Sequence, residues 1–496
     1  MPAAKRSLAG AGGSRATPAW VAVAAYVLLA GAVLVGSKLL VQRLGADQYA
    51  AVLVGVLLGV LLTIVSFRYL PFPYFLWILS VCGFRFLWSI RTPILPDLYL
   101  DRMAMIWLSV VFLIKIVAER RPLVRPLKID ILLLIHALYL LTQVIIQDME
   151  FFSTWTVCIL IPYTVFFMTK NIVTGRLIRT TLWILLVLSI YYNITAVAEK
   201  YHLNFLIWPK YIIGIEGEFR GRSQGPFLQA PLFGTVIGMM LPIHLYFMAT
   251  VRSNAARVLL VVSLIVGLAG LYFTYTRGSW LAGIAALGAT AVLNRKVYMR
   301  FLLPAVIIGV IVAVGVLGLA QDKFMKERVE NENTIGSRLA TAVTVFRVWR
   351  DAPVFGCGFF QYRNVREHYI EPVEIPGMPV IRFVQFRHNA IHDIYLGPLA
   401  ETGLVGTAMQ LGIYVLIWRA FIRKYPRRSE DDEFAALLMP VLAGILVGYL
   451  VGGLAFDYRF FSVTGTLFML SAAIIDGYRG EATRGGAGAG EVPAGL

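Results

Sequence analysis

Apolar runs of about 20 residues recur along almost the whole chain, and they restrict the fold more than any other feature. A helix needs about 20 predominantly apolar residues to cross the hydrocarbon core of a bilayer. Inside that core every backbone polar group must be satisfied within the protein, and a helix achieves this by itself. The sequence therefore predicts an all-α polytopic membrane protein. The runs lie at 19–40, 49–67, 72–90, 101–118, 129–147, 152–169, 177–198, 229–250, 257–276, 278–293, 301–319, 393–418, 435–455 and 459–476.

Composition supports this interpretation. The 496 residues are 58% hydrophobic and 15% charged, whereas a soluble domain has roughly 45–50% apolar and about 25% charged residues. The first apolar run is too long for the core of a signal peptide, so we interpret it as a retained span. We expect about 12–14 transmembrane helices in all.

The charged residues predict an orientation. If the N-terminus lies inside, most Lys and Arg of the short connections fall on the inner side, as the positive-inside rule requires. Both termini are then cytoplasmic. The expected organisation is a cytoplasmic tail at 1–18, a transmembrane bundle at 19–319 with an external loop at 199–228, a large external loop at 320–392, C-terminal transmembrane helices at 393–478 and a disordered cytoplasmic tail at 479–496.

The net charge of +17 raises the question of nucleic acid. In a membrane protein the positive-inside rule accounts for such a charge, so we expect no nucleic-acid partner. The three cysteines, Cys82, Cys158 and Cys357, form neither a disulfide framework nor a metal framework.

The large loop is expected to contain an amphipathic helix. Apolar residues recur at helical spacing between Ser337 and Arg350, and the Asp-Ala-Pro sequence after them should end the helix. Its expected apolar face consists of Leu339, Val343, Phe346 and Trp349. Such a helix is expected to lie on the membrane surface or to cap the bundle.

Two arginine segments lie on the expected outer side. Arg220 and Arg222 flank Gly221, and Arg277 follows Thr276 where two spans almost meet. Guanidinium groups pair bidentately with phosphate oxygens, so these segments suit a phosphate or diphosphate. The alternatives are lipid-headgroup contact for the first segment and an arginine extending to the interface for the second.

Two histidines, His388 and His392, open the segment that leads into the next span, and we expect the helix to begin with them. On a helix they would share a face. A zinc site needs a third ligand, for which Asp393 and Glu367 are candidates, but no His-Glu-x-x-His signature is present. His392 could instead act as a general base, or the histidines could only form hydrogen bonds.

Glu401 lies inside an otherwise apolar span, where a carboxylate is expected either to pair with an arginine or to function in catalysis. The Asp457-Tyr458-Arg459 sequence between the last two spans is expected to be interfacial and structural. Neither an acidic ladder typical of cation-coupled transporters nor a P-loop is found in the sequence.

These segments together resemble the O-antigen ligase and O-antigen/exopolysaccharide polymerase superfamily. The motifs that carry the resemblance are Thr276-Arg277-Gly278-Ser279-Trp280-Leu281, Ser337-Arg338, Asp351 to Gly358, and His392-Asp393 followed by Glu401-Thr402-Gly403. The family usually has His-Asn where this chain has His392-Asp393. His388-Asn389 preserves that dipeptide, but its distance from Glu401 does not fit, so His392 is the matching histidine.

The resemblance implies an inverting, metal-independent glycosyltransferase of the GT-C type, with one large periplasmic loop and no cofactor. Its donor would be a glycan on undecaprenyl diphosphate, and its acceptor a glycan or a lipid-linked sugar. The protein would lie in the bacterial inner membrane with its site facing the periplasm, where a chain-length regulator is a possible partner. The resemblance implies a catalytic role for His392 and diphosphate binding by Arg277, Arg222 and Arg220. Supporting roles are implied for Arg338, His388, Asp393 and Glu401.

Three functions remain open at this point. Repeat-unit polymerisation and ligation to lipid A-core share the donor chemistry and differ in the acceptor. The number of expected spans favours a polymerase. A glycan or lipid transporter would require charges at the midplane and inverted repeats, and neither is found in the sequence.

Overall fold

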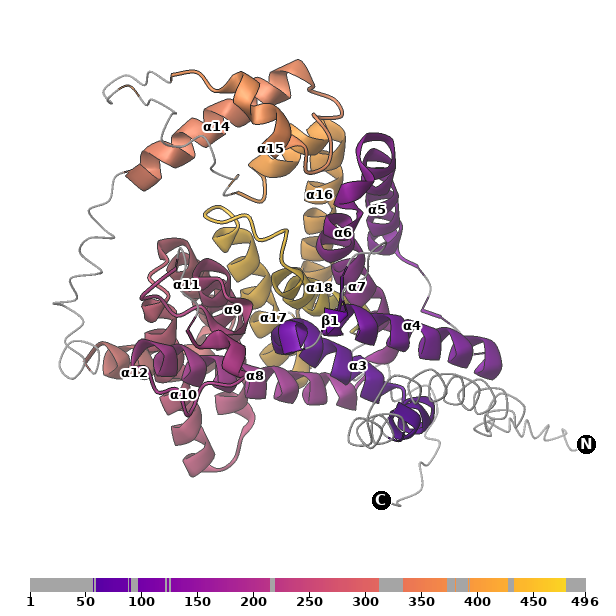
Figure 1. Ribbon diagram of the computed structural model, residues 1–496. Coiled ribbons are helices and arrows are strands. Elements are labelled where there is room, and N and C mark those ends of the chain that lie inside the picture. Colours follow the sequence, from indigo (N-terminus) through magenta and orange to yellow (C-terminus); the bar gives the residue numbers. More distant parts are fainter. Residues whose placement is uncertain are drawn as a thin grey trace, which may run out of the picture. The chain divides into compact units, whose positions relative to one another are not determined.

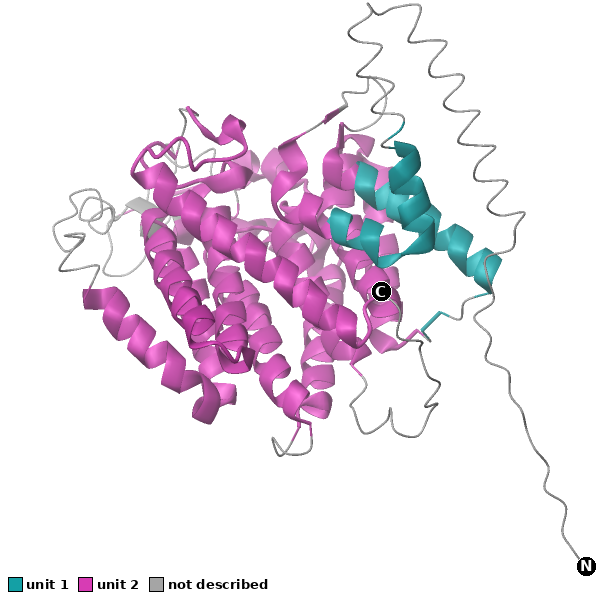
Figure 2. Ribbon diagram, turned by 90° about the horizontal axis from the view of Figure 1, so that it is seen from below, with its two compact units in different colours: residues 1–77, 103–125 teal, residues 78–102, 126–496 magenta. Residues whose placement is uncertain are grey.

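The computed structural model describes residues 57, 59–87, 89–90, 97–120, 123–124, 126–214, 219–311, 333–372, 380, 391, 393–426 and 432–478 (Figure 1). The first expected span, the C-terminal tail, His388 and His392 lie outside the described residues. Contact clustering divides the chain into two units, one of residues 1–77 and 103–125 and the other of residues 78–102 and 126–496 (Figure 2).

The described elements are almost all helical. The longer helices are α3 (Pro71–Leu79), α4 (Leu100–Glu119), α5 (Lys128–Gln147), α7 (Ile161–Ile172), α8 (Arg176–Lys200), α9 (Ala230–Thr250), α10 (Asn254–Phe273), α11 (Arg277–Leu293), α12 (Arg295–Ile311), α14 (Asn333–Asp351), α16 (Leu396–Lys424), α17 (Glu433–Gly452) and α18 (Ser462–Gly477). Single turns include α6 (Phe152–Trp155), α15 (Tyr362–Val365), η6 (Gly225–Phe227) and η9 (Arg366–Tyr369). Strands β1 (Ser89–Ile90) and β2 (Leu98–Tyr99) pair antiparallel, with Ser89 opposite Tyr99.

The predicted fold class is confirmed. Among the described residues, 7 helices are long and apolar enough to cross a membrane, and further apolar helices are shorter. Each expected span from 49–67 onward overlaps a helix. The total of 12–14 spans stays a prediction.

Small residues bring the central helices of the larger unit close together. A Cβ atom on Gly448 of α17 would lie 3.0 Å from the Cβ of Ala286 on α11, and one on Gly452 would lie 2.9 Å from that of Ala282. Small residues four apart on facing helices let the backbones approach closely, which is the usual basis of helix packing in membranes. This contact fixes α11, and therefore its first residue, Arg277.

The connections expected on the outer side meet at one end of the larger unit. The Ser223 hydroxyl donates to the Ala196 carbonyl on α8 at 2.7 Å, and the Ser223 amide donates to the Phe273 carbonyl on α10 at 3.0 Å. The Ile394 amide, before α16, donates to the Gly453 carbonyl after α17 at 2.9 Å. This grouping is what the predicted alternation of the spans requires.

At connections expected on the inner side, buried Lys170 pairs with Asp130 at 2.6 Å and with Asp476 at 2.8 Å. These three residues come from the start of α5 and the ends of α7 and α18. The inner connections of these helices therefore also meet.

The amphipathic helix of the large loop is confirmed as α14, but its expected apolar face is wrong in part. Phe346 is 50% exposed, while Val345 and Val348 are buried. These two valines join a cluster with Tyr362, Ile391 and Ala400, because α14 packs against η9 and the start of α16. Phe346 instead forms an edge-to-face ring contact with Trp349 of the same helix, with ring centroids 6.3 Å apart.

The start of the following helix also differs from the expectation. α16 begins at Leu396 rather than at His388, and Ile391 and Asp393 precede it outside any helix. The Asp393 carboxylate accepts hydrogen bonds from the Tyr395 and Leu396 amides at 2.6 and 2.9 Å. A carboxylate in this position satisfies the amides that a helix start leaves unpaired, so it determines where α16 begins.

Candidate functional site

The first part of the site is formed by residues 219–224 and the connection 274–277, which we call the arginine junction. Arg222 donates from Nε to the Thr274 carbonyl at 2.9 Å and from Nη2 to the Thr276 hydroxyl. Arg222 is thereby fixed to the residue that precedes Arg277. Arg277 and Arg220 are exposed. The junction thus presents exposed guanidinium groups beside the first turn of α11, where unpaired amides also favour an anion.

Glu199 holds the other end of the same loop. Its carboxylate accepts hydrogen bonds from the Gln224 amide at 2.7 Å and from the Gly225 amide at 2.8 Å. The loop that carries Arg220 and Arg222 is therefore attached to α8 by Glu199 and to the α10–α11 connection by Arg222. The sequence interpretation missed Glu199. The available signal was a carboxylate at the end of an apolar span, close to the arginine-rich loop.

The second part is a break inside α16. Gly403 has φ 62° and ψ −160°, which is not a helical conformation. The segment after α14 fills the break: the Cys357 and Gly358 amides donate to the carbonyls of Ala400 and Glu401 at 2.9 and 2.8 Å. The Leu404 amide donates back to the Pro353 carbonyl at 2.9 Å. The two motifs, one in the large loop and one in the following span, are thus hydrogen-bonded to each other.

Glycine is required on both sides of this contact. A Cβ atom on Gly403 would lie 2.4 Å from the Val354 carbonyl oxygen, and one on Gly356 would lie 2.4 Å from the Glu401 carbonyl carbon. Both glycines have positive φ. The two motifs therefore need glycine because their backbones touch.

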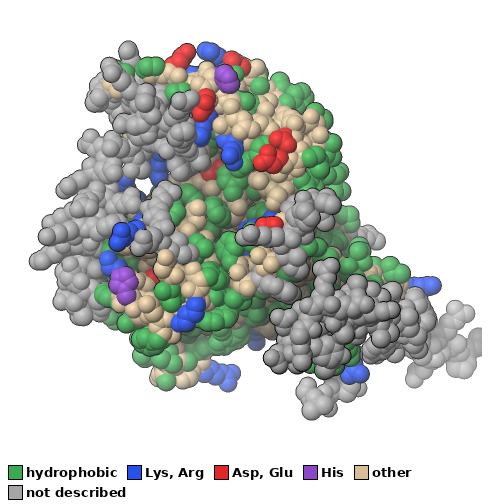
Figure 3. Space-filling model, in the orientation of Figure 1, with side chains coloured by type: hydrophobic (Ala, Val, Ile, Leu, Met, Phe, Trp, Pro, Cys, Tyr) green, Lys and Arg blue, Asp and Glu red, His purple; other side chains and the backbone are tan. Residues whose placement is uncertain are grey.

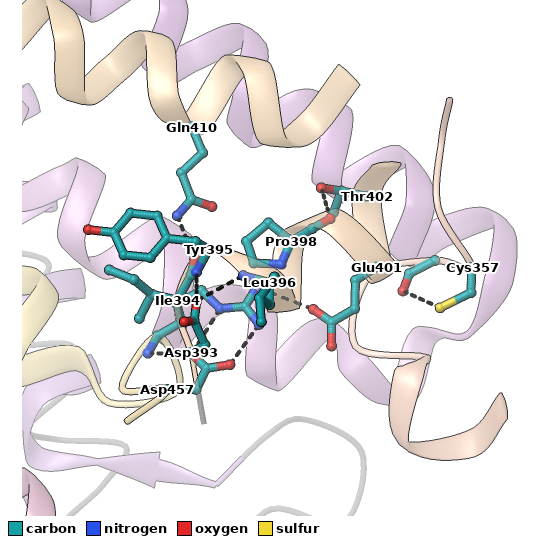
Figure 4. A network of polar contacts seen from close by, with 12 residues as sticks. Cys357, Asp393, Ile394, Tyr395, Leu396, Pro398, Glu401, Thr402, Gln410 and Asp457 are labelled. Carbon is teal, nitrogen blue, oxygen red and sulfur yellow. Dashed lines mark hydrogen bonds and ion pairs between the residues drawn. The ribbon is translucent and has the colours of Figure 1, made fainter. Parts of the chain in front are cut away.

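The third part is a buried cluster of Glu401, Asp457 and Arg459. Arg459 donates from Nη2 and Nε to the two Asp457 oxygens at 2.7 and 2.9 Å, and from Nη1 to Glu401 Oε2 at 3.2 Å. Burial alone would lower the pKa of Arg459, but the Asp457 and Glu401 carboxylates outweigh burial and raise it. Of the two alternatives for Glu401, the structure shows an arginine partner. The carboxyl groups of Asp393, Asp457 and Glu401 lie near one another at the start of α16 (Figure 4).

Arg338 and Asp393 connect the three parts. Arg338, on α14, donates from Nη2 to the Ala455 carbonyl at 3.0 Å. Burial lowers the pKa of Arg338, neighbouring Arg277 lowers it further, and Asp393 opposes both. Burial likewise raises the pKa of Asp393, whereas the hydrogen bonds from the Leu396 and Tyr395 amides oppose that rise. A Cβ atom on Gly278 would lie 2.3 Å from the Cβ of Ala455, and the Ile394 amide donates to the Gly453 carbonyl. The segment around Ala455 therefore brings Arg338 close to the residues next to Arg277 and Asp393, which are far apart in the sequence.

Several Lys and Arg side chains lie on the left half of the face shown in Figure 3. Both histidines proposed from the sequence, His388 and His392, lie outside the described residues, so the structure does not place them. In the part of the chain that is described, no group of three or more His, Cys, Asp or Glu side chains could hold a metal ion.

This arrangement can bind and stabilise negative charge. Exposed Arg277 lies at the start of α11, and exposed Arg220 lies in the loop that Arg222 attaches to the same connection. The carboxylates of Glu401 and Asp457, in contrast, are both paired with Arg459. Fixed cationic groups stabilise charge that develops on a leaving group without reorganising during the reaction.

Part of the chain that contains this site matches a known protein family. The family described as O-Antigen ligase matches residues 260–411, which run from α10 through the break in α16. The match confirms the resemblance to the O-antigen ligase and polymerase superfamily, a glycosyltransferase-type family of multi-pass membrane proteins. No match to a curated protein was found.

Proposed function

We propose that this membrane protein, which carries an O-antigen ligase domain, transfers a glycan from undecaprenyl diphosphate to an acceptor sugar hydroxyl. One observation supports the proposal: the matched segment contains Arg277, Arg338 and Asp393, and contacts with the segment 453–455 gather these parts of the chain at one end of the larger unit. By the orientation that the loop charges predict, this end faces the periplasm from the inner membrane.

The arginine junction is the proposed diphosphate site. Arg277 and Arg220 are exposed and can pair with phosphate oxygens, and Arg222 adds charge while it holds Thr274 and Thr276 in place. The diphosphate leaves with more negative charge than it carries in the bound donor. Guanidinium groups held in position stabilise that change, so the reaction we propose needs no metal ion.

His392 is the proposed general base. The acceptor hydroxyl must lose a proton as it attacks the anomeric carbon, and a neutral imidazole can accept it. Direct attack with departure of the diphosphate inverts the anomeric configuration. His392 precedes Asp393, whose carboxylate is held by two amides at the start of α16. His388, Asp393, Glu401 and Arg338 are proposed to support the site rather than react.

Two acceptors fit this chemistry. Growth of a repeat-unit polysaccharide is the first candidate and ligation to lipid A-core is the second, because both use the same donor. A purified undecaprenyl-diphosphate glycan supplied with each acceptor distinguishes them by chain growth or single transfer. Loss of activity in EDTA that one divalent ion restores would contradict the metal-free reaction.

The histidine assignment is tested by paired variants in the same assay. His392→Ala should lose about 10²–10⁴ in transfer rate, the usual contribution of a positioned base, whereas His388→Ala should lose much less. Donor binding should persist in both variants, because the arginines hold the diphosphate. The wild-type rate should rise as the pH passes through the ordinary pKa of a histidine side chain, about 6.5. An inactive His388→Ala beside an active His392→Ala would move the assignment to His388.

A further inference from the structure

An exposed apolar segment of the large loop lies between α5 and α16, two helices that are long and apolar enough to cross a membrane. Val354 and Phe355 in this segment are 47% and 61% exposed, and no side chain in residues 352–360 carries a charge. The segment follows directly after Arg350 and Asp351, whose charged side chains are exposed at the end of α14. Large apolar side chains exposed together mark a surface that contacts a partner protein or a membrane.

Contacts with α5 give the depth of the segment. A Cβ atom on Gly358 would collide with the side-chain amide of Gln147, the last residue of α5. Gln143 donates to the Phe355 carbonyl at 3.0 Å. From Gln147 back to Gln143 the helix descends about 6 Å, at about 1.5 Å per residue. Phe355 therefore lies about one helical turn below the end of a span.

The backbone carbonyls of the segment are satisfied by the protein. The Pro353 carbonyl accepts from the Leu404 amide at 2.9 Å, and the next carbonyl accepts from the Val405 amide at 3.1 Å. The Phe355 carbonyl has its donor on α5. A loop surrounded by water does not need such donors, because water supplies them. In the hydrocarbon region, irregular backbone is tolerated only where protein groups satisfy it, and this segment meets that condition.

The exposed pair continues the outward-facing apolar surface of the two helices. Ile145 and Ile146 near the end of α5 are exposed, and so is Leu404 of α16. In a span, exposed apolar side chains face acyl chains. On the side of α14, the indole of half-buried Trp349 donates to the Pro353 carbonyl at 3.2 Å. Tryptophan is typical of the boundary between headgroups and acyl chains, so this contact places the segment at that boundary.

We propose that residues 353–355 enter the leaflet on the side of the large loop, where Val354 and Phe355 contact lipid acyl chains. Phe359, further along the same segment, is buried and packs in a cluster with Leu140 of α5. The segment is thus held to the bundle by Phe359 while its exposed pair faces lipid. The large loop is anchored in the membrane at the point where it fills the break in α16. This inference does not rest on the proposed function.

The test places an environment-sensitive NBD fluorophore on Val354→Cys or Phe355→Cys in the full-length protein, with the three native cysteines replaced by alanine. The labelled protein is reconstituted in phosphatidylcholine nanodiscs that carry a spin-label quencher either high on the acyl chain or near its end. The emission of both probes should shift to the blue. The quencher high on the chain should reduce it more than the quencher near the end, and iodide in the water should hardly reduce it.

Two matched positions calibrate the measurement. Ile146→Cys, on the exposed face of α5, should be quenched by the lipid quenchers and not by iodide. Asn364→Cys, exposed on α15 of the same large loop, should be quenched by iodide and not by the lipid quenchers. The side chains at 354 and 355 are exposed, so neither cysteine removes a core contact, and each variant covers a failure of the other to insert.

The outcomes distinguish lipid from water and from protein. Iodide quenching at 354 and 355 as strong as that at Asn364→Cys would show that the segment lies in water and would overturn the proposal. A blue-shifted emission that neither iodide nor the lipid quenchers reduce would show that protein, such as a second copy of this chain, covers the segment. That result would also overturn the proposal.

Discussion

Arg222 and Arg277 belong to one junction but have different surroundings. Arg222 is half-buried and bonded to Thr274 and Thr276, whereas Arg277 is exposed at the start of α11. A guanidinium bonded to the backbone mainly fixes the loop. An exposed one beside it can reach a ligand, so Arg277 is the residue whose loss should affect transfer most directly.

Arg277→Ala should reduce transfer by about 10²–10³, the usual effect of removing one fixed group that stabilises developing charge. Arg277→Lys should restore little activity, because a single ammonium does not reproduce the paired donors of a guanidinium. Initial rates of the purified, normally inserted variants check this. Arg252→Ala, which removes an exposed arginine at the other end of α9, is the control and should be fully active. Full activity in Arg277→Ala would contradict the assignment.

The Glu401–Arg459–Asp457 cluster predicts an asymmetry between its members. Arg459→Leu leaves two buried carboxylates uncompensated, and removing one partner of a buried pair destabilises a protein by about 3–5 kcal/mol. Glu401→Gln should destabilise much less, because Arg459 keeps both bonds to Asp457. Unfolding of the purified variants in one detergent measures the difference. Equal destabilisation by both changes would contradict the larger contribution that we assign to the bonds between Arg459 and Asp457.

At the scale of elements, the break in α16 joins the large loop to the membrane bundle. Residues 353–358 replace the hydrogen bonds that the helix gives up around Gly403. On the opposite side, the Tyr139 hydroxyl of α5 donates to the Thr402 carbonyl at 3.0 Å. Further along α5, Gln143 donates to the Phe355 carbonyl at 3.0 Å. The break is therefore fully supported by neighbouring elements and gives the loop a fixed attachment close to Glu401.

Gly403→Ala should destabilise the protein by about 1–3 kcal/mol, the cost of placing another residue in a backbone region that essentially only glycine adopts, and further because its Cβ would collide with the Val354 carbonyl. Gly412→Ala, in the helical part of the same element, meets only the end of the Leu132 side chain and should have little effect. Thermal unfolding of the two variants tests this. A Gly403→Ala protein as stable as Gly412→Ala would mean that the break is not needed.

At the scale of the whole molecule, the alternation of inner and outer connections predicts the side on which each loop lies. A cysteine replacing exposed Asn364, after α14, should be labelled by an impermeant maleimide from outside intact cells. One replacing Arg252, between α9 and α10, should be labelled only after permeabilisation. Burial raises the pKa of the native Cys357 thiol to about 12, so this residue stays protonated near neutral pH and should contribute little background. Labelling in the reverse order would overturn the orientation.

The sequence by itself determined the fold class, the place of nearly every helix among the described residues and the resemblance to the O-antigen ligase family. These properties depend on local composition: an apolar run of sufficient length must become a helix in lipid, and the motifs are continuous stretches of chain. The sequence also correctly located the helix of the large loop, because its period is a local property.

Only the tertiary structure decided which residues meet. The partner of Glu401 is Arg459, 58 residues away, and Arg338 reaches Ala455 after two intervening spans. The face that α14 buries was mispredicted, since it depends on where η9 and α16 lie rather than on the helix's own pattern. Long-range contacts of this kind arise from packing between distant segments. The hydrophobic periodicity of a single segment does not predict which other segment it will contact.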